Sequence, residues 1–249
     1  MKLLRMTALL FVLLLAWVGQ ATAYTDVYNA ITENTTWTVA NSPYVVRSYN
    51  VYVAQGKTLT IQPGVVVKFD GIGVGLGIEG TLIADGDAGQ PIVFTSFQDD
   101  SHGGDTNGDG GATTPIRGDW GYLRFFSTSV NNVLDYAVIR YGSYGLIVDT
   151  DSLTLSNSTV EESGNDGIYV EGVSPTITGS AIRRNDGHGI KVYTSNATIT
   201  NNTINGNGTD GIWAGGDFSE ATITGNTITG NLSYPIYLEA SALNSTISG

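Results

Sequence analysis

Three residues that could exchange protons recur at equal intervals in the C-terminal half of the chain. They are Asp166, His188 and Asp210, each 22 residues after the one before (188 − 166 and 210 − 188). Two carboxyl groups beside an imidazole suit general acid–base cleavage of a glycosidic bond, provided that folding brings them together. The spacing therefore predicts a polysaccharide-cleaving site only if the chain itself repeats with this period.

A second set of residues shares the period and favours binding over cleavage. The set consists of Tyr169, Lys191, Tyr193, Trp213 and Tyr237. Aromatic faces cover the apolar side of a pyranose ring, and neighbouring polar groups bind its hydroxyls. We predict a glycan-binding surface at these residues. The alternative is ordinary packing of aromatic side chains between neighbouring strands.

Residues 98–119 form a segment rich in Asp and Gly that could bind a metal. Six side chains there carry suitable oxygen atoms: Asp99, Asp100, Asp105, Asn107, Asp109 and Asp119. The run from Asp105 to Gly110 places such ligands at alternate positions before a glycine, as calcium loops do. Ile116 stands where those loops carry a bidentate acid. We predict Ca²⁺ here, with Asp99, Asp100 or Asp119 completing the shell; the alternative is a solvated polar loop.

The elements that position these residues are short β segments that repeat about every 22 residues. One apolar position recurs at Leu134, Leu155, Ile177, Ile199, Ile223 and Ile247. The three segments of each period are too short for helices and alternate in polarity with a period of two. Such a unit cannot bury its own apolar face, so it must stack on copies of itself, with like positions about 4.8 Å apart. We expect an all-β, single-stranded parallel β-helix with rungs of about 22 residues.

Stacked rungs align side chains into columns along the axis. Asn185, Asn207 and Asn231 share one turn position, where we expect their amides to hydrogen-bond from rung to rung. The column Arg140, Glu161 and Arg183 predicts a ladder of exposed ion pairs. Two further columns pair outward hydroxyls: Thr154, Thr176, Thr198, Thr222 and Thr246 beside Ser156, Thr178, Thr200, Thr224 and Ser248. They resemble the arrays of ice-binding solenoids, although Thr suits any exposed strand.

The chain divides into four expected regions. Residues 1–23 have the basic start, apolar run and small-residue cleavage site of a secretory signal peptide. We expect residues 24–48 to form an N-terminal cap and residues 49–132 to form irregular rungs that carry the Asp/Gly insertion. Residues 133–249 are expected to form regular rungs that end without a cap, so that further rungs or a domain would cover them.

Several segments carry a resemblance to a known family. They are Gly56–Phe69, Glu79–Ile83, Pro91–Ser96, Gly118–Gly121, and Thr198–Ile204 followed by Asp210–Ile212. These resemble right-handed parallel β-helix repeats of the pectin-lyase-like kind over residues 45–249. The resemblance implies a right-handed β-helix, but the family includes lyases, hydrolases, adhesins and modules without assigned activity. Gly187-His188-Gly189 is similar to an element of its pectin-hydrolysing members, whereas their Asp-Asp pair matches only Asp99-Asp100, in the distant insertion.

Composition excludes several classes of function. The 249 residues include no cysteine, which excludes a disulfide framework, thiolate metal sites and a thiol nucleophile. The net charge is −12, from 11 Lys+Arg against 23 Asp+Glu, and this opposes binding to nucleic acid. No second apolar span follows the signal, so we expect a secreted, cell-surface or periplasmic product that is not inserted in a membrane.

Together these patterns predict an exported β-helix module that binds polysaccharide or a cell-surface partner without catalysis. Ca²⁺ is the one expected cofactor. The alternatives are a polysaccharide lyase or glycoside hydrolase on the same fold, and an ice-binding solenoid that uses the threonine columns.

Overall fold

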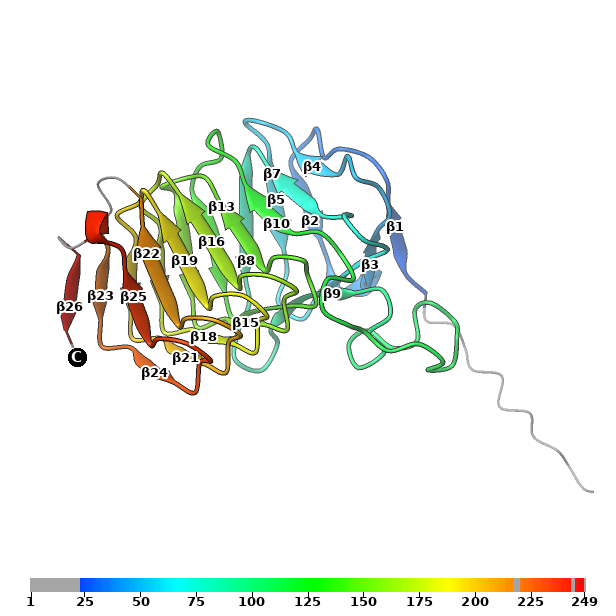
Figure 1. Ribbon diagram of the computed structural model, residues 1–249. Helices are drawn as coiled ribbons and strands as arrows, with labels where there is room; N and C mark the ends of the chain where they lie inside the picture. The colour runs from blue at the N-terminus through cyan, green and yellow to red at the C-terminus, as the bar shows by residue number, and fades with distance from the viewer. Residues whose placement is uncertain (1–22, 217–219, 243–244, 249) are drawn as a thin grey trace, which may run out of the picture.

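The computed structural model describes residues 23–216, 220–242 and 245–248. The chain winds into a right-handed parallel β-solenoid of about 10 turns, each taking about 23 residues (Figure 1). This confirms the predicted all-β, right-handed parallel β-helix. Within the described residues, two short 3-10 helices, η1 (Val39–Asn41) and η2 (Ala240–Ala242), interrupt the strands. The predicted signal peptide, residues 1–23, lies outside these residues except for its last position.

Three parallel sheets run along the solenoid. Sheet A contains β1 (Thr25–Val27), β3 (Tyr44–Val46), β6 (Val66–Phe69), β9 (Ile92–Ser96), β12 (Ala137–Arg140), β15 (Thr159–Glu161), β18 (Ala181–Arg183), β21 (Thr203–Asn205) and β24 (Thr227–Thr229). Sheet B contains β4 (Tyr52–Val53), β7 (Leu76–Ile78), β10 (Leu123–Phe125), β13 (Leu146–Val148), β16 (Ile168–Glu171), β19 (Ile190–Tyr193), β22 (Ile212–Gly215) and β25 (Ile236–Leu238). Sheet C contains β2 (Thr35–Trp37), β5 (Thr58–Ile61), β8 (Thr81–Asp85), β11 (Asn132–Asp135), β14 (Leu153–Ser156), β17 (Thr176–Thr178), β20 (Thr198–Thr200), β23 (Thr222–Thr224) and β26 (Thr246–Ser248).

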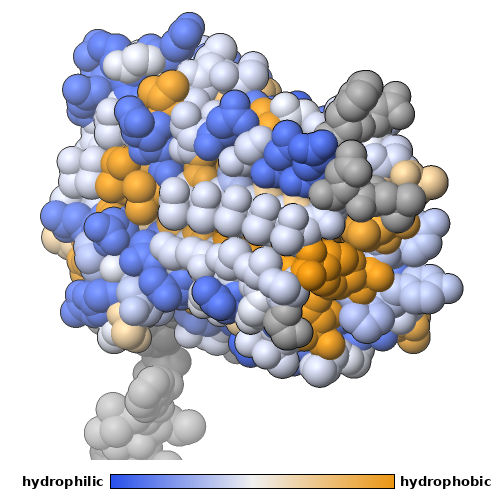
Figure 2. Space-filling view, turned by 90° about the vertical axis from the view of Figure 1, so that its left-hand side faces the viewer, coloured by the Kyte–Doolittle hydropathy of each residue, from blue (hydrophilic) through white to orange (hydrophobic). Residues whose placement is uncertain are grey.

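The apolar columns of the sequence form the core. Leu155 is in register with Ile177, and Ile177 with Ile199, and each of the three is at most 1% exposed. Residues on either side of them point outward, because side chains alternate along a strand. At the far end of sheet C, Ile247 of β26 is 47% exposed. Figure 2 looks onto this end, where hydrophobic residues are visible between hydrophilic ones.

The asparagine column holds the turns between sheets A and B. Nδ2 of Asn185 donates to Oδ1 of Asn207 at 3.0 Å, and Nδ2 of Asn207 donates to Oδ1 of Asn231 at 2.8 Å. The predicted rung-to-rung amide ladder is thereby confirmed. A glycine of the preceding rung leaves room for each amide. A Cβ atom at Gly189 would lie 2.8 Å from Nδ2 of Asn207, which is closer than side chains approach.

The N-terminal half stacks in the same register as the rest. Residues 24–48 supply β1, β2 and β3, which pair with the strands that follow them in sheets A and C. The Asp/Gly insertion lies between β9 and β10 without breaking the stack, since Phe94 of β9 still pairs with Ile139 of β12. Among the described residues, no helix has the length and apolar character needed to cross a membrane.

Candidate functional site

Four outward side chains of sheet B align across consecutive strands. Tyr169 of β16 is in register with Lys191 of β19, and Lys191 with Trp213 of β22. Trp213 is in turn in register with Tyr237 of β25. In β16, β19 and β22 the neighbouring strand positions are buried, so these side chains point outward. We call the four residues the aromatic strip; with Tyr193 beside them, the structure brings the whole predicted glycan-binding set together.

Lys191 occupies the space between two rings of the aromatic strip. Its Nζ lies 5.6 Å from the centroid of the Tyr169 ring and 5.2 Å from that of the Trp213 ring. Cation–π attraction at such distances holds the ammonium group against the rings. Tyr193 also stacks with Trp213, with centroids 6.3 Å apart and planes inclined by 17°. The strip is therefore ordered before any ligand arrives, which reduces the entropy lost on binding.

A hollow of about 290 Å³ opens beside Trp213. Both aromatic rings and polar groups line it: His188, Asp210, Trp213, Ser233, Tyr234, Tyr237 and Glu239. Gly215 makes room for this arrangement, because a Cβ atom there would lie 2.4 Å from the Trp213 ring and 2.5 Å from the Glu239 carboxylate. Tyr234 and Tyr237 are 59% and 40% exposed, so a ligand can reach their faces.

Three of these lining residues lie outside both the predicted binding set and the predicted catalytic candidates: Ser233, Tyr234 and Glu239. Glu239 lies two residues after Tyr237, so the two-residue alternation of a strand was the signal that could have included it. Ser233 and Tyr234 belong to the turn before β25, where Pro235 replaces the glycine of the earlier rungs. Tyr234 follows Asp210 by 24 residues, as Tyr237 follows Trp213, so the repeat itself aligns Tyr234 with the hollow. Only the folded turn places Ser233 there.

Asp166, His188 and Asp210 lie on successive rungs, as their spacing predicts, but each contacts the backbone of the next rung. Oδ1 of Asp166 accepts the N–H of His188 at 2.8 Å, and Oδ1 of Asp210 accepts the N–H of Tyr234 at 2.9 Å. Nδ1 of His188 lies 3.4 Å from the backbone nitrogen of Asp210 and 3.2 Å from its Oδ2. Both aspartates are buried, so their oxygens serve the stacking of the rungs.

Two rings of this region have shifted pKa values. Burial lowers the pKa of His188 below its ordinary 6.5 and outweighs the opposing effect of the Asp166 and Asp210 carboxylates. The hydroxyl of Tyr169 donates to Glu171 at 3.0 Å. Burial, followed by this hydrogen bond, raises the pKa of Tyr169 to about 12. Both rings are consequently uncharged at neutral pH.

Three of the six predicted calcium ligands converge in the loop after β9. Oxygen atoms of Asp100, Asp105 and Asp109 lie within 4.8 Å of one another, and Oδ1 of Asp100 is buried without a hydrogen-bond partner. Asn107 adjoins them, since its Nδ2 donates to Asp109 at 2.9 Å. Burial raises the pKa of Asp100, and the nearby charges of Asp105 and Asp109 raise it further.

The structure does not bring Asp99 and Asp119 into this cluster. Oδ2 of Asp119 accepts hydrogen bonds from Ser96 at 2.8 Å and from the backbone of Ile116 at 2.9 Å. Asp99 is 2% exposed and accepts the hydroxyl of Thr95 at 2.6 Å. Burial raises the pKa of Asp99, but hydrogen bonds from His102, Ser101 and Thr95 outweigh it and hold the pKa below its ordinary value. These two carboxylates tie the loop to β9.

A buried ammonium group lies beneath the acidic loop. Lys68 of β6 is fully buried, and its Nζ donates to the carbonyl oxygen of Gly104 at 2.8 Å. Burial lowers the pKa of Lys68, while Asp99, Asp100 and Asp105 oppose the shift. The loop therefore already has one positive charge beneath its carboxylates.

Comparison with known families agrees with this architecture. The family model described as "Right handed beta helix region" matches residues 125–249, which is just over half of the chain. The chain is a right-handed β-helix protein. Comparison with curated proteins and with solved structures gave no match.

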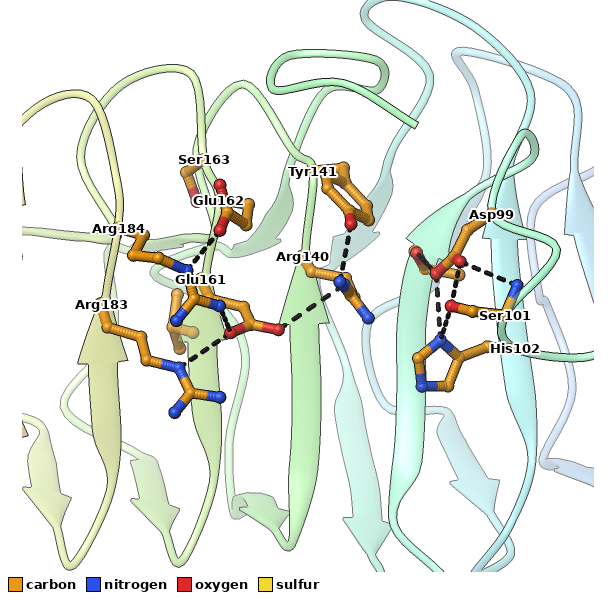
Figure 3. A network of polar contacts seen from close by, with 12 residues as sticks. Asp99, Ser101, His102, Arg140, Tyr141, Glu161, Glu162, Ser163, Arg183 and Arg184 are labelled. Atoms are coloured by element: carbon orange, nitrogen blue, oxygen red, sulfur yellow. Dashed lines mark hydrogen bonds and ion pairs between the residues drawn. The ribbon is translucent and has the colours of Figure 1, made fainter. Parts of the chain in front are cut away.

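On sheet A of this β-helix protein, the predicted ladder of exposed ion pairs is centred on a buried residue. Glu161 of β15 is only 5% exposed. Its carboxylate binds Arg183 at 2.9 Å, Arg184, and Arg140 at 3.6 Å (Figure 3). The prediction was therefore wrong about the exposure of Glu161, because guanidinium groups from the rung before it and the rung after it contact the carboxylate. A buried carboxylate such as that of Glu161 loses its hydration and needs these ion pairs to offset the loss.

The threonine columns lie on the outer face of sheet C. Thr176 is in register with Thr198, and Thr178 with Thr200, so their predicted alignment is confirmed. The hydroxyl of Thr200 also donates to that of Thr178 at 3.0 Å. Some of these hydroxyls thus bind one another along the axis. Ice binding stays a prediction.

Proposed function

We propose that this β-helix protein binds a neutral polysaccharide along the outer face of sheet B, without cleaving it. The observation that carries the proposal is the partly exposed Trp213 ring, which packs against Lys191 and Tyr193 of β19 beside a hollow that Glu239 also lines. The C–H face of a pyranose would stack on such a ring, and its hydroxyls would donate to Glu239.

The charge of the protein supports a neutral ligand. The chain carries a net charge of −12, and Asp210, Glu171 and Glu239 surround the aromatic strip. Their carboxylates would repel the uronate groups of an acidic polysaccharide, and Lys191 offers one ammonium group in return. A chain of uncharged sugars meets no such repulsion.

The hydrogen bonds of the Asp166–His188–Asp210 column support binding over catalysis. A general acid or base needs a proton-transferring atom that faces the substrate. Here Oδ1 of each aspartate accepts a backbone N–H of the next rung, and Nδ1 of His188 faces Asp210. These atoms are engaged within the solenoid.

Export would bring the protein to such ligands. The predicted signal peptide would deliver the mature chain outside the cytoplasm, where structural polysaccharides occur on cell surfaces. A cell-surface glycan is therefore the partner that we propose.

Affinity gel electrophoresis tests the proposal. Wild-type protein would run through native gels that contain glucomannan, xylan or mixed-linkage β-glucan, with homogalacturonan and alginate as acidic probes. We expect retardation by at least one neutral polymer, weakened about tenfold or more in Trp213→Ala, which corresponds to about 1.4 kcal/mol. Tyr28→Ala is the matched control, because Tyr28 is 53% exposed and lies outside the strip.

Three outcomes would contradict the proposal. Equal retardation of wild type and Trp213→Ala removes the aromatic strip from binding. Retardation by the acidic probes alone would contradict the expectation that the carboxylates around the aromatic strip repel acidic polysaccharides. Release of reducing or unsaturated ends from any probe, abolished in Asp210→Asn, would establish the enzyme alternative.

A further inference from the structure

We infer that sheet B carries a second saccharide-binding site, about five rungs from the first, so that one polysaccharide chain spans both. The inference rests on the proposed function and concerns where else along the face the same ligand is held.

The column that contains the aromatic strip continues toward the N-terminus. Before Tyr169 its outward positions are Ile147, Arg124, Gly77 and Tyr52, each in register with the next. Figure 1 shows the strands that carry this column, from β4 to β25, in one row. Among the described positions of the column, only Gly77 has no side chain. The column therefore has a gap at β7.

That gap is a hollow of about 140 Å³. Its walls include the rings of Tyr49, Tyr52, Tyr122 and Phe126, and Glu79 supplies a carboxylate. We call these five residues and Gly77 the glycine notch. Tyr49 is 74% exposed and Tyr52 is 36% exposed, so both rings can be reached from solvent.

Glycines are what allow the rings to approach one another here. A Cβ atom at Gly77 would lie 3.0 Å from the Phe126 ring and 3.3 Å from Cβ of Tyr52. A Cβ atom at Gly73, whose φ is +80°, would lie 3.2 Å from the Tyr49 ring. Contacts this short would push the rings away. Gly73 and Gly77 therefore give the notch its shape, because larger side chains there would fill the hollow or displace its aromatic rings.

The chemistry of the notch repeats that of the hollow beside Trp213. Each site combines aromatic walls with a carboxylate on the outer face of sheet B, which is the combination that recognises an uncharged sugar. Five strand steps separate β7 from β22, through β10, β13, β16 and β19. At about 4.8 Å per step the two sites are about 24 Å apart. A polysaccharide lying along the axis can occupy both, and simultaneous binding strengthens its attachment without any new kind of contact.

The experiment uses the neutral polymer that retards the wild type and a trisaccharide cut from it, which is too short to bridge the two sites. Isothermal titration with the trisaccharide would compare wild type, Trp213→Ala and the double variant Tyr49→Ala/Tyr52→Ala. Tyr28→Ala again serves as control, and the melting temperature of each variant checks its folding.

We expect two trisaccharide sites in the wild type and one in each variant. We also expect the double variant to lose about tenfold or more in affinity for the polymer, because bridging is lost. One site in the wild type, abolished by Trp213→Ala and unaffected by the double variant, would overturn the inference and leave the proposed function standing. Loss only in the double variant would overturn the proposed site at Trp213 and keep the notch. Absence of binding to every polymer would overturn both.

Discussion

The imidazole of His188 and the carboxylate of Asp210 meet on successive rungs, with Nδ1 of the histidine 3.2 Å from Oδ2 of the aspartate. The other carboxylate oxygen, Oδ1, accepts the backbone N–H of Tyr234 one rung further on. Two residues that the sequence offers as acid–base catalysts therefore connect successive rungs through hydrogen bonds. Their loss is expected to weaken the fold at the hollow beside Trp213.

Removing the Asp210 carboxylate should destabilise the protein. Asp210→Ala removes the charged acceptor of the partly buried hydrogen bond from the N–H of Tyr234, and we expect the free energy of unfolding to fall by about 1–3 kcal/mol. Asp210→Asn keeps an oxygen at that position and should lose less. Urea denaturation measures the difference, with Glu33→Ala as a control because Glu33 is 82% exposed and forms only a surface pair with Lys57. Equal stability of Asp210→Ala and wild type would refute the backbone link.

The stability of the protein should depend on pH through His188. Burial holds the pKa of this histidine below 6.5 in the folded chain, while Asp166 and Asp210 oppose the shift and Lys191 adds to it. The unfolded chain then binds the proton more readily, so the free energy of unfolding falls as pH drops through 6.5 towards the folded pKa. Urea denaturation between about pH 7.5 and pH 5, where most carboxylates stay ionised, should show a smaller fall in His188→Gln. Parallel profiles for the two proteins would contradict this origin of the pH dependence.

The amide ladder should contribute strongly at Asn207. Its Oδ1 accepts the backbone N–H and Nδ2 of Asn185, and its Nδ2 donates to Asn231, while the residue is 1% exposed. Asn207→Ala should lower the free energy of unfolding by about 2–4 kcal/mol, since several buried groups lose partners together. Asn165→Ala is a suitable control, because Asn165 is exposed and its side chain makes an exposed hydrogen bond to the carbonyl oxygen of Ser143. A loss no larger than that of the control would show that the ladder is dispensable.

The predicted Ca²⁺ site is tested by metal removal. If Ca²⁺ joins Asp100, Asp105 and Asp109, the melting temperature should fall on addition of a chelator and recover with excess Ca²⁺. Asp100→Asn should then abolish the response. A melting temperature indifferent to chelator, together with a more stable Asp100→Asn, would show instead that the carboxylates only repel one another above Lys68.

The repeat and its columns could be predicted from the sequence because a solenoid converts a fixed interval along the chain into contact between rungs. The apolar positions from Leu155 to Ile199, the amides from Asn185 to Asn231 and the strip from Tyr169 to Tyr237 all lie at that interval. For these residues the spacing alone specifies the neighbour.

Residues outside the repeat were decided by the tertiary structure. Asp99 and Asp119 lie in the predicted calcium loop, yet hydrogen bonds from Thr95 and Ser96 at the end of β9 hold them elsewhere. The direction in which these two side chains point depends on hydrogen-bond partners that no local sequence pattern identifies.

The sequence by itself determined the fold and the aromatic strip, since both follow from the period. Only the tertiary structure decided the burial of Glu161 under three arginines and the glycine notch at Gly77. The notch joins Tyr49, Tyr52 and Phe126 across a long insertion that the period does not span. Charge burial and hollow shape are set by what packs around a residue, and that depends on the whole arrangement of the chain in space.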